Sequence, residues 1–137
     1  MKQIYVDLGL VFWLQKMVAD GLSFHLFTNN ATPNRETTLG GLTEATWTNY
    51  SPILVSGGSF TLFGVAGHRG HLSAADISFL NDSGGTQTAY GYYITDGDGM
   101  DPLLLAAARF DDAPLARDDQ DSWNIVPRIG DFSEFAS

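Results

Sequence analysis

The sequence contains no cysteine and few basic residues, and each absence narrows the chemistry available to it. Without thiols, the chain of 137 residues forms no disulfide and offers no thiolate to a metal or a substrate. The 7 Lys and Arg stand against 16 Asp and Glu, which gives a formal net charge of −9. Nucleic-acid affinity comes mainly from basic residues that displace counterions from phosphates. Because the arginines are scattered singly, we expect no nucleic-acid partner.

Long apolar runs are also missing. A helix that spans a membrane needs about 18 or more consecutive apolar residues. The most apolar stretch, Leu8 to Ala19, is interrupted by Gln15 and Lys16. A cleavable signal peptide is disfavoured as well, because Asp7 and Lys16 interrupt its apolar centre. We therefore expect no membrane partner and interpret this stretch as a helix of the mature protein.

The residues that are abundant favour a β-rich fold. Gly occurs 15 times, aromatics make up 12% of the chain, and the hydrophobic content of 44% is that of a globular protein. Short strands joined by tight turns require such a composition. We predict a single domain over residues 1–137, built as a mainly β, antiparallel β-sandwich of jelly-roll type with one N-terminal amphipathic α-helix. A possible N-terminal arm (1–5) and an extended C-terminal tail (122–137) complete it.

The helix is predicted from a cap and from a period near four residues. Asp7 suits the first position, because a carboxylate accepts from the free N–H groups of a helix start. Gly21 is a natural end. One broad apolar face would carry Val6, Leu10, Trp13, Leu14, Met17 and Val18.

From Leu22 the apolar period changes to two, which predicts a central strand through Leu22, Phe24 and Leu26. A long polar connection follows over 29–41, and we expect it to bind a surface or to be ordered by a partner. The β-formers of Thr46 to Tyr50 then predict a second strand that ends at Pro52.

Further strands are predicted where β-branched and aromatic residues lie between turns. The segment 86–95 is the strongest of them, and Gly91 within it indicates a bulge or a close approach of a neighbour. The apolar run 102–110 has helical propensity, yet its position between turns favours a strand. The remaining predictions are a turn around 56–58, strands at 59–63, 72–80 and 123–129, a turn at 81–85 and an acidic loop at 111–121.

No motif identifies a reaction. The carboxylates of Asp96, Asp98 and Asp101 are weak candidates for calcium, because their loop departs from the EF-hand pattern. His68 and His71 lack further nearby ligands for zinc. His25 lies in the first predicted strand, where we interpret it as a hydrogen-bonded inter-strand histidine. The sequence thus predicts no enzyme, no catalytic residue, no resident metal and no cofactor.

Residues 95–121 hold eight of the sixteen acidic residues, so this region forms one acidic end of the molecule. Two interpretations remain open. The acidic loop could be a surface segment kept mobile by its own repulsion, or it could dock onto a basic partner through charge complementarity.

Several motifs together carry a resemblance. They are the helix Val6–Gly21, Leu26-Phe27-Thr28-Asn29-Asn30 with Pro33, Leu42-Thr43-Glu44-Ala45 with Trp47 and Tyr50, and the segment Tyr90–Asp96. In this pattern the chain resembles small virion structural proteins of tailed bacteriophages, most closely the capsid decoration (cement) proteins. The resemblance covers about half of the chain and says little about the residues after Asp101.

The resemblance implies a structural protein that binds and stabilises the capsid shell. Its expected partners are the major capsid protein and further copies of itself, as a homodimer or homotrimer. Its expected location is the capsid surface of a virion made in the host cytoplasm. Aromatic residues are common interface anchors, so we expect interface roles for Trp47, Trp123, Phe132 and Phe135, together with Asn29 and Asn30 of the polar connection.

An alternative function is a receptor- or carbohydrate-binding module associated with a tail or fibre. That function predicts aromatic side chains exposed on a shallow surface, for which the candidates are Trp47, Tyr50, Tyr92 and Tyr93.

Overall fold

A computed structural model describes residue 16 and residues 19–63, 71–96 and 102–129. The predicted helix and the arm at 1–5 fall outside the described residues, apart from the end of the helix. Within the described part of the chain the protein is mainly β with antiparallel sheets, as predicted. No helix there is long and apolar enough to cross a membrane.

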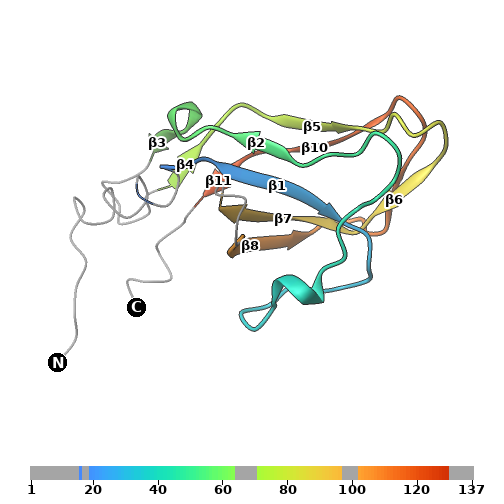
Figure 1. Cartoon of the computed structure of the whole chain (residues 1–137), viewed down its shortest axis with the longest axis horizontal. Helices are drawn as coiled ribbons and strands as arrows, with labels where there is room; N and C mark the ends of the chain where they lie inside the picture. The colour runs from blue at the N-terminus through green and yellow to red at the C-terminus, as the bar shows by residue number, and fades with distance from the viewer. Residues whose placement is uncertain (1–15, 17–18, 64–70, 97–101, 130–137) are drawn as a thin grey trace.

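The strands are short and follow one another through the whole described chain (Figure 1). They are β1 (Leu22–Phe27), β2 (Ile53–Val55), β3 (Thr61–Phe63), β4 (His71–Ser73), β5 (Ile77–Leu80), β6 (Gln87–Ala89), β7 (Gly91–Asp96), β8 (Leu104–Arg109), β9 (Leu115–Arg117), β10 (Ser122–Ile125) and β11 (Arg128–Ile129). Two single 3₁₀ turns, η1 (Leu39–Gly41) and η2 (Gly57–Ser59), interrupt the connections.

The predicted central strand is confirmed as β1, which lies inside the four-stranded sheet β2-β1-β7-β8. The alternation of its sequence explains that position. Leu22, Phe24 and Leu26 point to one face and each has 0% exposed surface. The register runs from Leu22 opposite Asp96 to Phe27 opposite Gly91, so β7 covers the whole length of β1.

Residues 71–96 and 104–129 form one long antiparallel ribbon. Leu72 pairs with Ile129, Phe79 with Trp123, and Ala89 with Leu115. The same order continues in β7 and β8, where Tyr93 pairs with Ala107. Figure 1 shows the ribbon turning over at β6, so that β5 and β10 lie on one side of β1, and β7 and β8 on the other.

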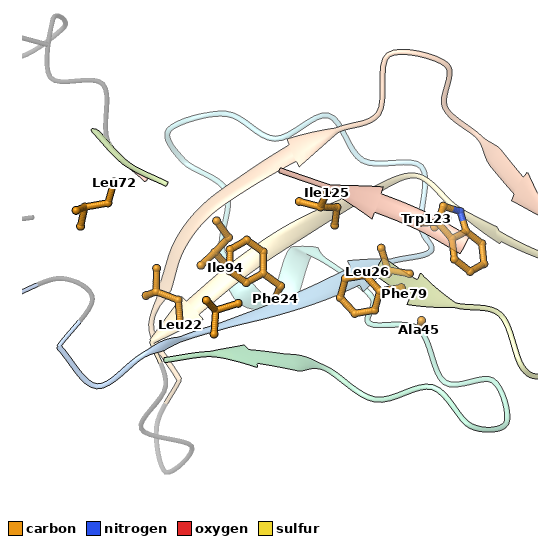
Figure 2. Packing of buried hydrophobic residues seen from close by; sticks show 11 residues of the cluster. Leu22, Phe24, Leu26, Ala45, Leu72, Phe79, Ile94, Trp123 and Ile125 are labelled. Carbon is orange, nitrogen blue, oxygen red and sulfur yellow. The ribbon is translucent and has the colours of Figure 1, made fainter. Parts of the chain in front are cut away.

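The fold of this ribbon encloses the main core. Phe24 and Leu26 of β1 meet Phe79 of β5 and Trp123 of β10 in one buried cluster (Figure 2). The Trp123 ring is fully buried, and its indole N–H donates to the carbonyl of Leu115 at 2.9 Å. The core is thus made from residues about a hundred positions apart in the sequence.

A second, smaller cluster lies on the other face of the four-stranded sheet. Phe27, Leu42 and Tyr93 are its buried members, and Ala31 and Leu39 pack against them. The polar connection after β1 therefore brings its own apolar residues back onto the sheet and covers that face.

Two predictions of local structure need correction or refinement. The strand predicted at Thr46 to Tyr50 is wrong, because the backbone turns there: Tyr50 N–H donates to Trp47 C=O, and Asn49 has a φ of 64°. The sheet strand is β2, which begins after Pro52. The acidic loop contains a short strand, β9, within its predicted range.

The run 102–110, which could be helix or strand, and the described part of the predicted tail both contain strands that pair with other strands. The apolar run 102–110 contains strand β8, which confirms the strand prediction. Residues 122–129 contain β10 and β11, paired with β5 and β4, so this part of the predicted tail belongs to the sheets. The predicted last strand is therefore present as two strands, one on each side of Pro127, and residues 130–137 lie outside the described part.

The close approach of a neighbour predicted at Gly91 is confirmed, because the backbone of β8 and the ring of Phe27 lie against it. A Cβ atom at this position would collide with the carbonyl oxygen of Ala108 and would lie 2.6 Å from the ring of Phe27. No rotamer of Phe27 relieves the collision with a backbone oxygen. Glycine is therefore required where β1, β7 and β8 come closest together.

We expect Gly91→Ala to lower the free energy of unfolding by about 1–3 kcal/mol, the usual cost of overpacking. Urea titration followed by tryptophan fluorescence measures it. Gly58→Ala is the matched control, because a Cβ at Gly58 meets no atom within 4 Å. Equal unfolding midpoints for the two variants would contradict the steric role of Gly91.

Candidate functional site

The edge of β1 that faces away from β7 is completed by a side chain. The Leu26 carbonyl accepts from Ala45 N–H at 3.0 Å, but no backbone carbonyl of the described chain accepts from the Leu26 N–H. The Tyr50 hydroxyl accepts that N–H at 3.0 Å and donates to Glu44 Oε2 at 2.9 Å. The turn at Trp47 to Tyr50 thus places the Tyr50 hydroxyl where it accepts the hydrogen bond of the Leu26 N–H, a buried group that needs an acceptor.

The same carboxylate anchors His25. His25 Nδ1 lies 2.6 Å from Glu44 Oε2, and His25 Nε2 lies 2.9 Å from Thr95 Oγ1. A carboxylate accepts, so Nδ1–H donates to Glu44, while Nε2 and the Thr95 hydroxyl share the second hydrogen bond. The imidazole also stacks on Tyr93 with ring centroids 4.6 Å apart and planes 4° apart. His25 is thus the inter-strand histidine that the sequence predicted.

The order Thr95, His25, Glu44 is that of a nucleophile, a base and an orienting acid. A nucleophile must also reach its substrate, and Thr95 is only 2% exposed. The carboxylate is further shared with Tyr50. We conclude that this arrangement ties β1 to β7 and to the segment beside Glu44, and that it has no geometry for attack on a substrate.

Burial governs the acid–base behaviour of the tyrosines in this network. For Tyr50, burial raises the pKa of the phenol well above its ordinary value; the bond from Leu26 lowers it somewhat, and Glu44 raises it. For Tyr93, burial is again the main cause of a raised pKa, and the negative charge of Glu44 adds to it. Burial alone raises the pKa of Tyr92. All three phenols are held in the neutral form.

The connection after β1 is fastened at both ends by one side chain. Asn29 Oδ1 accepts from Thr43 N–H at 2.9 Å, and Asn29 Nδ2 donates to the Gly41 carbonyl at 2.9 Å. Farther along, Arg109 of β8 donates to Asn30 Oδ1 at 2.8 Å and to the Ala31 carbonyl at 2.9 Å. The protein's own residues therefore fix the loop against β8.

Beside this loop, β8 has no strand on its outer edge in the described part of the chain. The N–H of Phe110 donates to Tyr90, toward β7. Because backbone groups alternate along a strand, those of Ala108 and Ala106 also point to β7. The N–H and C=O groups of Ala107 and Arg109 point outward. A groove of about 240 Å³ runs there between the loop and the strand, lined by Pro33, Asn34, Arg35, Thr37 and Leu104 to Ala107.

The described residues that were predicted for an interface have roles within the fold. Trp123 lies in the core, so it is not an exposed anchor. Trp47 is half-buried and stacks on Trp123, with ring centroids 5.2 Å apart. Asn29 and Asn30 hold the loop, as described above. Phe132 and Phe135 lie outside the described residues.

The predicted ion sites are also not assembled by the described residues. Asp96 closes the turn between β7 and β8, since its Oδ1 accepts from Leu103 N–H at 3.1 Å. Asp98, Asp101 and His68 fall outside the described residues. Within the described part, no three His, Asp or Glu side chains come close enough to hold a metal.

The acidic loop is attached to the turn at 81–85. Asp118 Oδ1 accepts from the Thr86 hydroxyl at 2.9 Å, and Asp119 Oδ1 accepts from Gly84 N–H at 3.0 Å. The fully buried Asn81 donates its amide to the carbonyls of Gly85 and Arg117, both at 2.8 Å. These aspartates therefore serve as acceptors for their own turn, in addition to any charge they present outward.

No protein-family model, curated protein or solved structure matches this chain.

Removing the Tyr50 hydroxyl should destabilise the protein, because the buried Leu26 N–H loses its hydrogen-bond acceptor. We expect Tyr50→Phe to lower the free energy of unfolding at pH 7 by about 1–3 kcal/mol, because a buried N–H is left without an acceptor. Tyr90→Phe is the control, since no hydrogen bond involves the Tyr90 hydroxyl in the described chain, and it should change the value by less than about 0.5 kcal/mol. Equal losses in urea titrations would contradict the role of Tyr50.

The buried phenols also predict a loss of stability at high pH. Below pH about 10, the folded and the unfolded chain both keep the Tyr50 proton. Above it, the unfolded chain releases the proton first, so the free energy of unfolding falls by up to about 1.4 kcal/mol per pH unit for each such tyrosine. Urea titrations at pH 8 to 11 should give a smaller slope for Tyr50→Phe than for the wild type. Identical slopes would refute the assignment.

Proposed function

We propose that this protein is a structural virion protein that binds and stabilises a phage capsid as a decoration protein. The resemblance of its strand and loop motifs to small phage virion proteins supports this role. The proposed role is architectural and needs neither a catalytic residue nor a cofactor.

We further propose that the sheets together form a β-sandwich of jelly-roll type. Support comes from the core, where Phe24 and Ile94 of one sheet share a cluster with Phe79 and Ile125 of the β5–β10 pair. Such a body presents strand edges and loops at its rim, which are suited to adhesion.

The observation that carries the proposal is the outer edge of β8, which pairs with no strand of the described residues. Proteins usually protect a sheet edge with charges, prolines or bulges, because free N–H and C=O groups attract another strand. β8 has a bulge near Thr95, but residues 103–108 contain no charged side chain. In a chain with a net charge of −9, an uncharged edge of this length is suited to binding a protein strand.

The loop beside β8 adds a second contact surface. Arg109 holds it in place through Asn30 and Ala31, so binding would not have to order it. We assign the major capsid protein as the partner of the surface formed by β8 and residues 33–37. Copies of the chain arranged as a homodimer or homotrimer would repeat this contact, and repeated contacts multiply as effective concentration.

Co-sedimentation with purified capsids of the encoding phage tests the proposal. We expect the wild-type chain to sediment with capsids up to a fixed number of copies per capsid. Ala106→Lys should weaken this binding at least tenfold, because it places a charge on the edge strand. Ala116→Lys is the matched control: it makes the same change on another exposed strand residue, in β9, and should bind as the wild type does.

Failure of the wild-type chain to bind capsids would refute the decoration function. Capsid binding that Ala106→Lys leaves unchanged would keep the function but remove the β8 edge from it. A truncation that ends at Ile129 tests the tail separately, whereas removal of residues 122–129 would also delete the buried Trp123 and Ile125.

A further inference from the structure

A second groove, at the end where the ribbon turns over, has a different character. It has a volume of about 510 Å³, in the range of small-molecule sites, and it is shallow and open. Its lining comes from the residue after β1, from the segment after Ala45, and from β6 with the residue before it. Its lining residues are Thr28, Thr46, Trp47, Thr86, Gln87 and Thr88. It shares no residue with the groove beside β8.

The lining is polar but carries no charge. Four threonines, a glutamine and a tryptophan form it, in a chain whose net charge is −9. A cationic ligand would find no carboxylate in this lining, and an anionic ligand would find no basic side chain. The composition therefore favours a neutral ligand rich in hydrogen-bonding groups.

Trp47 forms a rigid aromatic wall of this groove. Its ring stacks on Trp123 at 5.2 Å between centroids, and it meets Tyr50 edge-on at 5.6 Å. Trp123 is itself fixed by burial and by its bond to Leu115. A ring supported in this way loses little conformational freedom when a ligand packs against it.

Several polar groups of the groove have hydrogen-bonding capacity left over. The hydroxyls of Thr28 and Thr86 are engaged with the Thr43 carbonyl and with Asp118. By contrast, in the described chain no hydrogen bond uses the hydroxyl of Thr46 or Thr88, or the indole N–H of Trp47. The Gln87 amide nitrogen donates to Ser83, which leaves its carbonyl oxygen as an acceptor.

We propose that this groove binds a neutral saccharide, with one sugar ring packed against Trp47. The C–H face of a pyranose is apolar and flat, whereas its rim carries hydroxyls that both donate and accept. An indole wall with surrounding threonine hydroxyls and an amide oxygen matches both properties. This activity goes beyond capsid decoration and would give the same subunit an adhesive function toward glycans.

The test is a glycan array that contains neutral oligomers of glucose, galactose, mannose and N-acetylglucosamine as well as sialylated glycans. The tightest neutral hit is then titrated against the full chain by calorimetry and by tryptophan fluorescence. We expect Thr88→Arg, which fills the groove from an exposed position, to weaken binding at least tenfold. Thr88→Val, which removes one hydroxyl, should weaken it about two- to tenfold.

Thr48→Val is the matched control, because Thr48 is exposed in the same segment but does not line the groove. It should bind as the wild type does. Three results would overturn the inference: no neutral glycan bound by the wild type, binding restricted to sialylated glycans, or binding that Thr88→Arg leaves intact. A chain that binds the saccharide but not capsids would refute the decoration function and leave this inference standing.

Discussion

The structure depends on hydrogen-bonding both edges of the buried strand β1. Its side chains Leu22, Phe24 and Leu26 lie in the core, so water cannot satisfy its backbone groups. β7 serves one edge along its full length. The other edge is served in pieces, by β2, by the segment at Glu44 and Ala45, and by the Tyr50 hydroxyl at Leu26. The irregular chain between Thr43 and Val55 follows from this division.

The same requirement links the strands to the loop that covers them. Glu44 orients Tyr50 toward the core side of β1 and His25 on the opposite face, so one carboxylate couples both faces of the sheet. Asn29 closes the loop just before the Glu44 segment begins. The proposed β8 edge and Trp47 groove lie on this internally linked body.

Sequence patterns predicted the strands whose alternation, β-forming residues or flanking turns match their place in the sheet. β1 and β7 combine alternation with β-forming residues, and the apolar run of β8 lies between turns, so these predictions are confirmed. Thr46 to Tyr50 failed for the opposite reason. Its β-forming residues are used for a turn that buries two rings and delivers a hydroxyl, a tertiary requirement that no local pattern reveals. The three-residue strand β2 is too short to give a periodic signal.

The candidate sites were less predictable than the strands, because each is made by segments distant in sequence. His25 was interpreted correctly from its place in a strand, but its partners Glu44 and Thr95 are 19 and 70 positions away. Trp47 and Trp123 had equal claims to an interface from their residue type alone. Their different exposure follows from the position of Trp123 on β10, where its ring is fully buried in the main cluster with Phe24 and Phe79.

The folded ribbon also determines when the main core can be completed during synthesis. β5 pairs with β10, so the main core is complete only after residues 122–125 have been synthesised. Pairings of such long sequence separation are slow to form. Until then the core side chains of β1 lack the rings and aliphatic groups of β10 that cover them, and exposed apolar surface favours association with other chains. A chain cut short before β10 would therefore leave Phe24, Leu26 and Phe79 without the Trp123 ring that completes their cluster.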